Sequence, residues 1–273
     1  MAFQSRSRKV SELRWAALGG LPVVLFLLFV GLPLAAILAR GAGEPGFISR
    51  LTDASVLQPL RITFATSLIT LAVICVACTP VSYVLARKRF PGRDIVDSLV
   101  ELPTVLPPVV AGLGMLMAFG QRSEIGQALE AIGISLPFSM TAVVFAQIFV
   151  SAPFFIRAAK IGFESVDRSL EETALTLGAP PLQVFFRITL PLASRSMIGG
   201  AVLSWTRAIG EFGATLMFAG SLAGRTQTMP LAIMAAFEHD LGATLALATV
   251  LMAISLAVLV VTRLLLRRWS VLT

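Results

Sequence analysis

The sequence ESVDRSLEETALTLGAPPLQVFFRITLP, residues 164–191, is the longest polar stretch of a very apolar chain. Its pattern predicts two short helices. Ser169, followed three residues later by Glu172, is typical of a capping box at a helix start. Gly178 suits the left-handed conformation that ends a helix, and the Pro180–Pro181 pair favours the first turn of a second one. These features alone also fit an amphipathic helix that lies on a lipid surface.

The composition indicates a membrane protein with several spans. Of the 273 residues, 56% are hydrophobic and 14% are charged, whereas a soluble domain carries about 25% charged residues. We expect the formal net charge of +7 to set the orientation of the chain in a membrane. No basic helix with interleaved aromatic residues indicates a nucleic-acid partner.

Six apolar segments are expected to cross the membrane, because a spanning helix needs about 20 such residues. They cover residues 15–39, 62–86, 95–120, 136–156, 197–219 and 241–262. We therefore expect an all-α polytopic membrane protein with two parts. Residues 1–60 would form a cytoplasmic tail, the first transmembrane helix and an outer loop with a short surface helix over 47–60. Residues 61–268 would form a domain of five core helices, with a polar loop over 157–195.

The first segment has an alternative interpretation as a cleaved signal peptide. Its apolar run is long compared with the signal-peptide core of about 7–15 residues, so a retained membrane anchor is expected.

Basic residues orient these segments. Six spans bring both termini to one side, and Arg and Lys cluster at both termini and in the loops 87–95 and 157–195. The opposite loops hold only the isolated residues Arg40, Arg50, Arg61, Arg122 and Arg225. Because cytoplasmic loops are enriched in Arg and Lys, the termini and residues 164–191 are predicted to be cytoplasmic.

Proline and glycine interrupt the third apolar segment, which contains Pro103, Pro107, Pro108, Gly112 and Gly114. One interpretation is a kinked helix packed through small residues. The other is a broken helix that lines a transport path. The two are compatible, and both stay open at this point.

The fifth apolar segment carries an opposite-charge pair, Arg207 and Glu211, whose spacing places both residues on one side of a helix. Charged residues in a span usually face a cavity or a partner. The alternative is a pair that neutralises itself within a packed bundle. The candidate path or gate residues are Arg207, Glu211, Gly210, Gly213, Pro107, Pro108 and Gly112.

No catalytic motif is present. The single histidine, His239, lies between two acidic residues, and there is no Walker motif, so the chain is not expected to hydrolyse ATP. Cys75 and Cys78 are interpreted as small packing residues. We expect no metal and no cofactor in this chain.

The polar stretch also resembles a family signature. Glu172-Thr173-Ala174, then Gly178, Ile188 and Leu190-Pro191 match the pattern Glu-Ala-Ala-x3-Gly-x9-Ile-x-Leu-Pro, with Thr173 as the one departure. This pattern resembles the "EAA" signature of ATP-binding-cassette (ABC) importer permeases. The resemblance implies a type I permease fold with a cytoplasmic coupling helix that docks on an ATPase subunit. The implied coupling residues are Glu171, Glu172, Thr173, Ala174, Gly178, Ile188, Leu190 and Pro191.

Three further stretches narrow the resemblance to the molybdate and sulfate branch. VLPPVVAG at 105–112 is similar to that branch, and AIGEFGAT at 208–215 and GRTQTMPLAI at 224–233 resemble the molybdate permeases. The implied function is alternating-access import of molybdate or tungstate across the cytoplasmic membrane, with sulfate or thiosulfate as the alternative. The implied partners are a second copy of the chain, an extracytoplasmic oxyanion-binding protein, membrane lipid and two ABC ATPases, which would hold ATP and magnesium.

The residues alone leave two other classes of protein open, an ion-gradient-driven secondary transporter and a structural membrane protein. Carboxylates that could relay protons inside the spans are sparse, chiefly Glu211. The polar and bent segments argue against a purely structural role.

Overall fold

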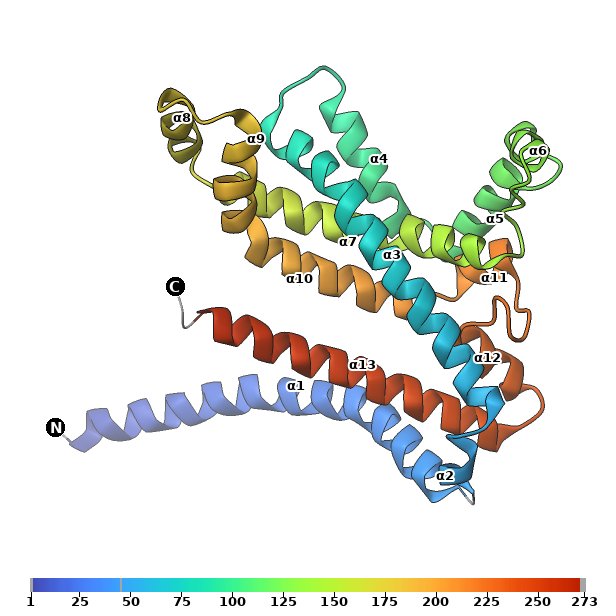
Figure 1. Cartoon of the computed structure of the whole chain (residues 1–273). Helices are drawn as coiled ribbons and strands as arrows, with labels where there is room; N and C mark the ends of the chain where they lie inside the picture. The colour runs from blue at the N-terminus through green and yellow to red at the C-terminus, as the bar shows by residue number, and fades with distance from the viewer. Residues whose placement is uncertain (1, 45, 271–273) are drawn as a thin grey trace.

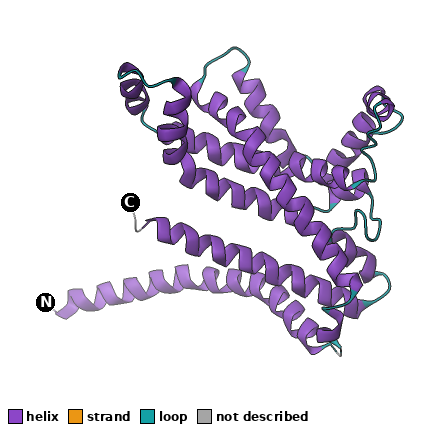
Figure 2. Ribbon diagram, in the orientation of Figure 1, coloured by secondary structure: helices purple, strands orange, loops and turns teal. Residues whose placement is uncertain are grey.

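The computed structural model describes residues 2–44 and 46–270, and in these ranges its regular elements are all helical (Figures 1 and 2). The predicted all-α class is therefore confirmed. In chain order the helices are α1 Ala2–Gly43, α2 Phe47–Arg50, α3 Ala54–Arg87, α4 Arg93–Val105, α5 Pro108–Phe119, α6 Glu124–Ala131, α7 Met140–Ser165, α8 Arg168–Thr176, α9 Pro181–Val184, the π-helical turn η1 Phe185–Thr189, α10 Leu190–Ile209, α11 Gly213–Ala219, α12 Met229–Phe237 and α13 Leu241–Ser270.

Among the described residues, four helical segments are long and apolar enough to cross a membrane. They are Gly20–Gly43, Ala54–Arg87, Met140–Ser165 and Leu241–Val261. Helices α4 and α5 make a fifth if they count as one span, although they are bent by 116° relative to each other. The structure thus gives four or five candidate spans where six were predicted, and neither 95–120 nor 197–219 is one continuous helix.

Backbone chemistry explains the first interruption. Leu106 and Pro107 are extended, with ψ of 135° and 129°. A proline disfavours the helical conformation in the residue before it and lacks the N–H of a helical hydrogen bond. Two successive prolines at 107 and 108 therefore end α4 and start α5.

Two predicted boundaries also differ. The expected surface helix over 47–60 is only the short α2, and α3 begins at Ala54. The loop predicted from residue 157 begins only at Val166, because α7 continues to Ser165. A helix can continue past its apolar, membrane-crossing part until the local sequence ends it. Here α7 ends just before Asp167, which caps the start of the next helix.

Helices α3, α7 and α10 pack together as the core of the bundle (Figure 1). The buried Gln147 of α7 accepts a hydrogen bond from the Thr70 hydroxyl (2.9 Å) and donates one to the Thr66 hydroxyl (3.3 Å). Trp205 of α10 donates its indole N–H to Ser67 (3.1 Å). Because the hydrocarbon interior offers no water, these groups must find partners between helices.

Helices α1 and α13 lie side by side next to this core (Figure 1). No residue of the most apolar 18-residue window in Gly20–Gly43 is buried within the chain. At one end of the molecule, Arg50 forms an ion pair with Asp240, just before α13 (2.8 Å). Helices α8 and α9 lie at the opposite end (Figure 1).

Candidate functional site

Helix α8 starts two residues earlier than the predicted capping box at Ser169 implies. The Asp167 carboxylate accepts a hydrogen bond from the Ser169 N–H (2.9 Å), and this bond lowers the pKa of Asp167. Asp167 is therefore the N-cap. The predicted capping box of Ser169 with Glu172 is wrong, because a carboxylate two positions upstream already satisfies the exposed N–H.

Gly178 ends α8 as predicted. Its φ is +88°, in the left-handed region, and the Ala179 N–H donates to the Ala174 carbonyl (3.0 Å). This is the hydrogen-bond pattern of a Schellman cap. No atom lies within 4 Å of a Cβ built on Gly178, so its backbone conformation, and not the space around it, favours glycine.

The second helix of the loop is not separate from the membrane domain. Helix α9 passes through η1 into α10, and the junction residues Phe185 and Leu190 keep right-handed helical angles. Pro191 cannot donate an α-helical hydrogen bond, and the wider π turn lies directly before it. Ile188, Leu190 and Pro191 therefore lie on the helix that leads into the membrane, and their coupling role stays a prediction.

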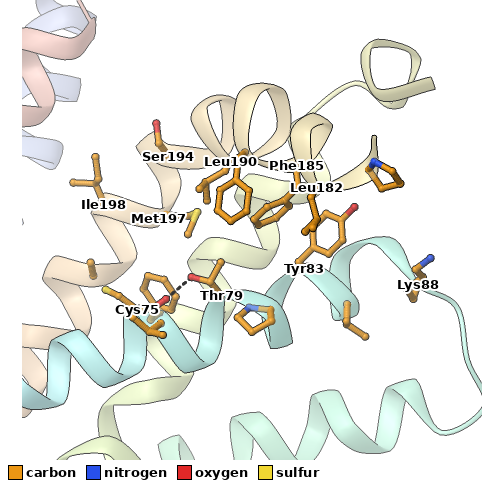
Figure 3. A pocket seen from close by; sticks show the side chains of 17 residues that line it. Cys75, Thr79, Tyr83, Lys88, Leu182, Phe185, Leu190, Ser194, Met197 and Ile198 are labelled. Carbon is orange, nitrogen blue, oxygen red and sulfur yellow. Dashed lines mark hydrogen bonds between the residues drawn. The ribbon is translucent and has the colours of Figure 1, made fainter. Parts of the chain in front are cut away.

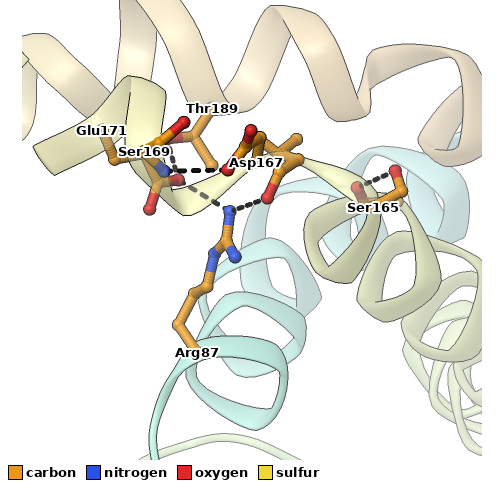
Figure 4. A network of polar contacts seen from close by, with 8 residues as sticks. Arg87, Ser165, Asp167, Ser169, Glu171 and Thr189 are labelled. Carbon is orange, nitrogen blue, oxygen red and sulfur yellow. Dashed lines mark hydrogen bonds and ion pairs between the residues drawn. The ribbon is translucent and has the colours of Figure 1, made fainter. Parts of the chain in front are cut away.

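The two adjacent glutamates of α8 have different surroundings. Glu172 is exposed. The Glu171 side chain is only 14% exposed and forms an ion pair with Arg87 at the end of α3 (2.9 Å). The same carboxylate accepts a hydrogen bond from the Thr189 hydroxyl (2.7 Å), and Arg87 also donates to the Val166 carbonyl (3.0 Å). We call these four groups the Arg87 network (Figure 4).

Sequence reasoning assigned Glu171 to the docking surface and missed Arg87 and Thr189. The one local signal is that Arg87 is the first residue of the basic run that follows an apolar segment. Its partner lies 84 positions away, a distance that spacing within a single helix cannot reveal.

The outer surface of the loop is apolar as well as charged. The exposed fractions of Leu170, Leu175, Leu177 and Leu182 are 48%, 45%, 82% and 73%. Thr173 beside them is exposed, and Ala174 is half-buried. Exposed apolar residues grouped on a polar loop indicate a surface that another molecule covers.

A cavity of about 940 Å³ lies between α3, η1 and α10, beside this loop (Figure 3). Tyr83 and Thr79 of α3 face Leu182, Phe185 and Leu190 across it (Figure 3). Free Cys75 lines the same cavity, and it and Cys78 are half-buried packing residues, as expected. Among the described residues, no group of His, Cys, Asp and Glu could hold a metal ion.

The two helix interruptions meet in space, because α5 packs against α11. A Cβ on Gly112 would lie 2.6 Å from the Ala214 carbonyl oxygen, and one on Gly213 would lie 3.1 Å from Pro108 and Val109. Five of the predicted path residues are therefore at or beside these interruptions: Pro107, Pro108, Gly112, Gly210 and Gly213. Gly210 ends α10 and is exposed.

Arg207 and Glu211 form the predicted ion pair (2.7 Å), but not within one helix, because α10 ends at Ile209. The Glu211 side chain is 1% exposed and its other oxygen accepts the Ala214 N–H (2.7 Å) at the start of α11. The Arg207 side chain is 29% exposed. The buried Glu211 carboxylate thus holds the Arg207 side chain, which itself stays partly exposed.

Comparison with known proteins agrees with these features. The family model of the binding-protein-dependent transport system inner membrane component matches residues 78–271. The molybdenum transport system permease protein ModB of Mycobacterium tuberculosis is 40% identical over 244 residues, which cover 89% of this chain and 90% of that protein. The sulfate transport system permease protein CysW of Synechococcus elongatus is 37% identical over 228 residues, covering 80% of each chain.

A solved structure shares the fold. The chain matches a bacterial ABC transporter involved in alginate import with a TM-score of 0.74 and 17% identity, covering 96% of this chain and 99% of the other. The fold is thus that of ABC importer permeases. The family match makes the chain a transport component of the inner membrane and not an enzyme. The matched family model, the 40% identity over most of the length and the shared fold together show that this chain belongs to the binding-protein-dependent inner membrane permeases of ABC oxyanion importers.

Proposed function

We propose that the chain is the permease subunit of an ATP-driven importer for molybdate or tungstate. It would work as a homodimer with two ABC ATPases and an extracytoplasmic binding protein, as a six-span type I permease with both termini in the cytoplasm. The observation that carries the substrate is the 40% identity to a molybdenum permease over 244 residues. The 37% identity to a sulfate permease makes sulfate the second candidate.

The coupling role rests on the exposed surface of α8 and its flanking loop. Glu172 and Thr173 are exposed beside the four leucines described above. A surface of this kind offers an apolar anchor and a charge to an ATPase. Because it lies in a basic loop, the positive-inside rule supports a cytoplasmic location.

The path role rests on Arg207. The residue lies about 25 Å along α10 from its cytoplasmic end, at the helical rise of 1.5 Å per residue, and therefore in the outer part of the membrane. Tetrahedral oxyanions are good partners for a guanidinium, which donates several hydrogen bonds in a fixed geometry. Glu211 would keep Arg207 oriented while its remaining exposed surface meets the anion.

In the proposed cycle, ATP-driven closure of the ATPase pair moves the two coupling helices. The spans then switch from inward-open to outward-open, and the binding protein releases its anion near Arg207. Hydrolysis resets the inward-open arrangement. The exposed apolar surface of α1 would be covered by lipid and by the second copy.

Uptake into vesicles tests this proposal. The chain is reconstituted with its ATPase and its binding protein, and molybdate, tungstate and sulfate are followed by elemental analysis. We expect ATP-dependent uptake of molybdate or tungstate with sulfate excluded. Uptake of sulfate alone would move the assignment to the second candidate, and no uptake of any of the three would contradict the oxyanion function.

A further inference from the structure

We propose that Arg87 is the positioning residue that makes the coupling loop, the segment after α7 that carries α8 and α9, move as one body with helix α3. Movement of this loop would then reach the outer side of the membrane through α3. This inference rests on the proposed coupling function. The inference adds to that function the helix that transmits the movement and the contact that holds this helix to the loop.

The Arg87 network joins three separate segments. Arg87 ends α3, Glu171 is on α8, and Thr189 is the last residue of η1. The side chains of Arg87 and Glu171 are 7% and 14% exposed, with 2.9 Å between the charged atoms. Arg87 also bonds the Val166 carbonyl between α7 and α8. A single guanidinium thus holds the start of α8 at two points, through the Val166 carbonyl before the helix and the Glu171 carboxylate in its first turn (Figure 4).

Aromatic packing supports the same connection. Tyr83, one turn before Arg87 on α3, makes edge-on contacts with Phe163 and Phe185, with ring centroids 5.5 Å and 5.0 Å away. Phe185 belongs to η1, directly after α9. Charge and aromatic contacts therefore hold the same helix end against the same loop.

At its other end, α3 reaches the segment that carries α12. The Thr63 hydroxyl accepts a hydrogen bond from the Met229 N–H (2.8 Å), and Val56 packs with Met229 and Ala232 in a buried cluster. Helix α3 runs without interruption for 34 residues, about 50 Å at the usual rise. It is thus long enough to connect the coupling loop with the outer segments.

The burial of the pair explains why its loss would uncouple the loop. A surface ion pair contributes little, because water and salt screen it. Removing one partner of a buried pair instead leaves an uncompensated charge, which strongly disfavours the packed arrangement. Without Arg87, Glu171 would turn toward water, and α8 would follow the ATPase without moving α3.

The first measurement compares Arg87→Ala with the native chain in the reconstituted complex, as anions imported per ATP hydrolysed. We expect assembly and ATP hydrolysis to persist while this ratio falls on the order of tenfold. A purely structural role would reduce the amount of folded complex and leave the ratio in assembled complexes unchanged. Thr189→Val, which keeps the ion pair and removes one hydrogen bond, should give a smaller fall.

Glu164→Gln is the matched control. It removes the neighbouring ion pair with Arg93, whose side chains are 30% and 44% exposed and whose charged atoms are 3.5 Å apart. We expect the ratio to stay native in this variant. An equal fall in Glu164→Gln and Arg87→Ala would overturn the specific role of the Arg87 network.

The second measurement does not depend on the anion. Spin labels are attached at positions 169 on α8 and 88 after α3, in a chain whose Cys75 and Cys78 are replaced by alanine. In the otherwise native complex we expect one narrow distribution of distances between the two labels, unchanged by ATP. In Arg87→Ala we expect this distribution to be broad. A separation that changes with ATP in the native complex, or stays narrow in the variant, overturns the proposal. If the complex imports none of the three oxyanions, this measurement still decides the role of Arg87.

Discussion

Gly112 of α5 lies against Ala214 of α11 so closely that a Cβ on Gly112 would be 2.6 Å from the Ala214 carbonyl oxygen. This contact joins the two helices that begin directly after the interruptions of the bundle. It also explains why a residue without a side chain occupies a position in the middle of an apolar helix.

Gly112→Ala should therefore destabilise the protein. The added methyl group would have to displace backbone atoms, and overpacking of this kind typically costs about 1–3 kcal/mol. Thermal unfolding in detergent micelles measures the change. Gly114→Ala on the same helix is the control, because no atom outside the local helix backbone lies within 4 Å of the Cβ position there, and it should be neutral or slightly stabilising. An equal loss in both variants would contradict the close contact.

Arg207→Ala should lower both uptake and stability. The buried Glu211 carboxylate would lose its ion pair and keep only the Ala214 N–H, which costs about 2 kcal/mol. Anion uptake and unfolding are measured on the same preparation. Glu211→Gln keeps an acceptor for that N–H and should retain more stability. Arg195→Ala, an exposed arginine near the other end of the same helix, should behave like the native chain. Native uptake in Arg207→Ala would remove Arg207 from the path.

Gly178→Val should impair coupling. At φ of +88° a β-branched residue is strained by about 1–3 kcal/mol, so the end of α8 and its exposed leucines would be displaced. Co-purification with the ATPase and ATP-dependent uptake are the measurements. Gly178→Asn is the matched variant, since asparagine tolerates the left-handed region better, and it should retain most activity. Normal transport in Gly178→Val with an intact ATPase complex would exclude the coupling assignment.

The Arg50–Asp240 ion pair should make stability fall in acid. A hydrogen bond from Arg50 lowers the pKa of Asp240, so the folded state binds this proton less readily than the unfolded chain. The contribution is complete above the unfolded pKa of about 4 and is lost as the pH falls through the lowered folded value. Asp240→Asn removes the charge and keeps an acceptor for the Ala243 N–H, which Asp240 bonds at 3.0 Å. The unfolding temperatures of native chain and variant should differ at pH 7 and converge as the pH falls through the lowered folded pKa of Asp240, and a constant difference would contradict this role.

Several features followed from the sequence itself. The apolar segments indicated a helical membrane protein, because a single segment in lipid can pair its backbone N–H and C=O groups only by forming a helix. The end of α8 was predictable at Gly178 because its conformation depends on local backbone sterics. The EAA pattern indicated the permease family, which the comparisons confirm. Each of these features depends on residues that are close together along the chain.

Other features depended on contacts between distant residues. The interruption after Ile209 and the 116° bend between α4 and α5 are stable because α5 and α11 pack against each other through Gly112 and Gly213. Glu171 turned inward because Arg87, which no local pattern connects to it, lies at the end of another helix. Local sequence chemistry determined the apolar segments and the helix end at Gly178, whereas tertiary packing decided which charges became internal and how the broken helices meet, since burial and pairing exist only once distant segments are in contact.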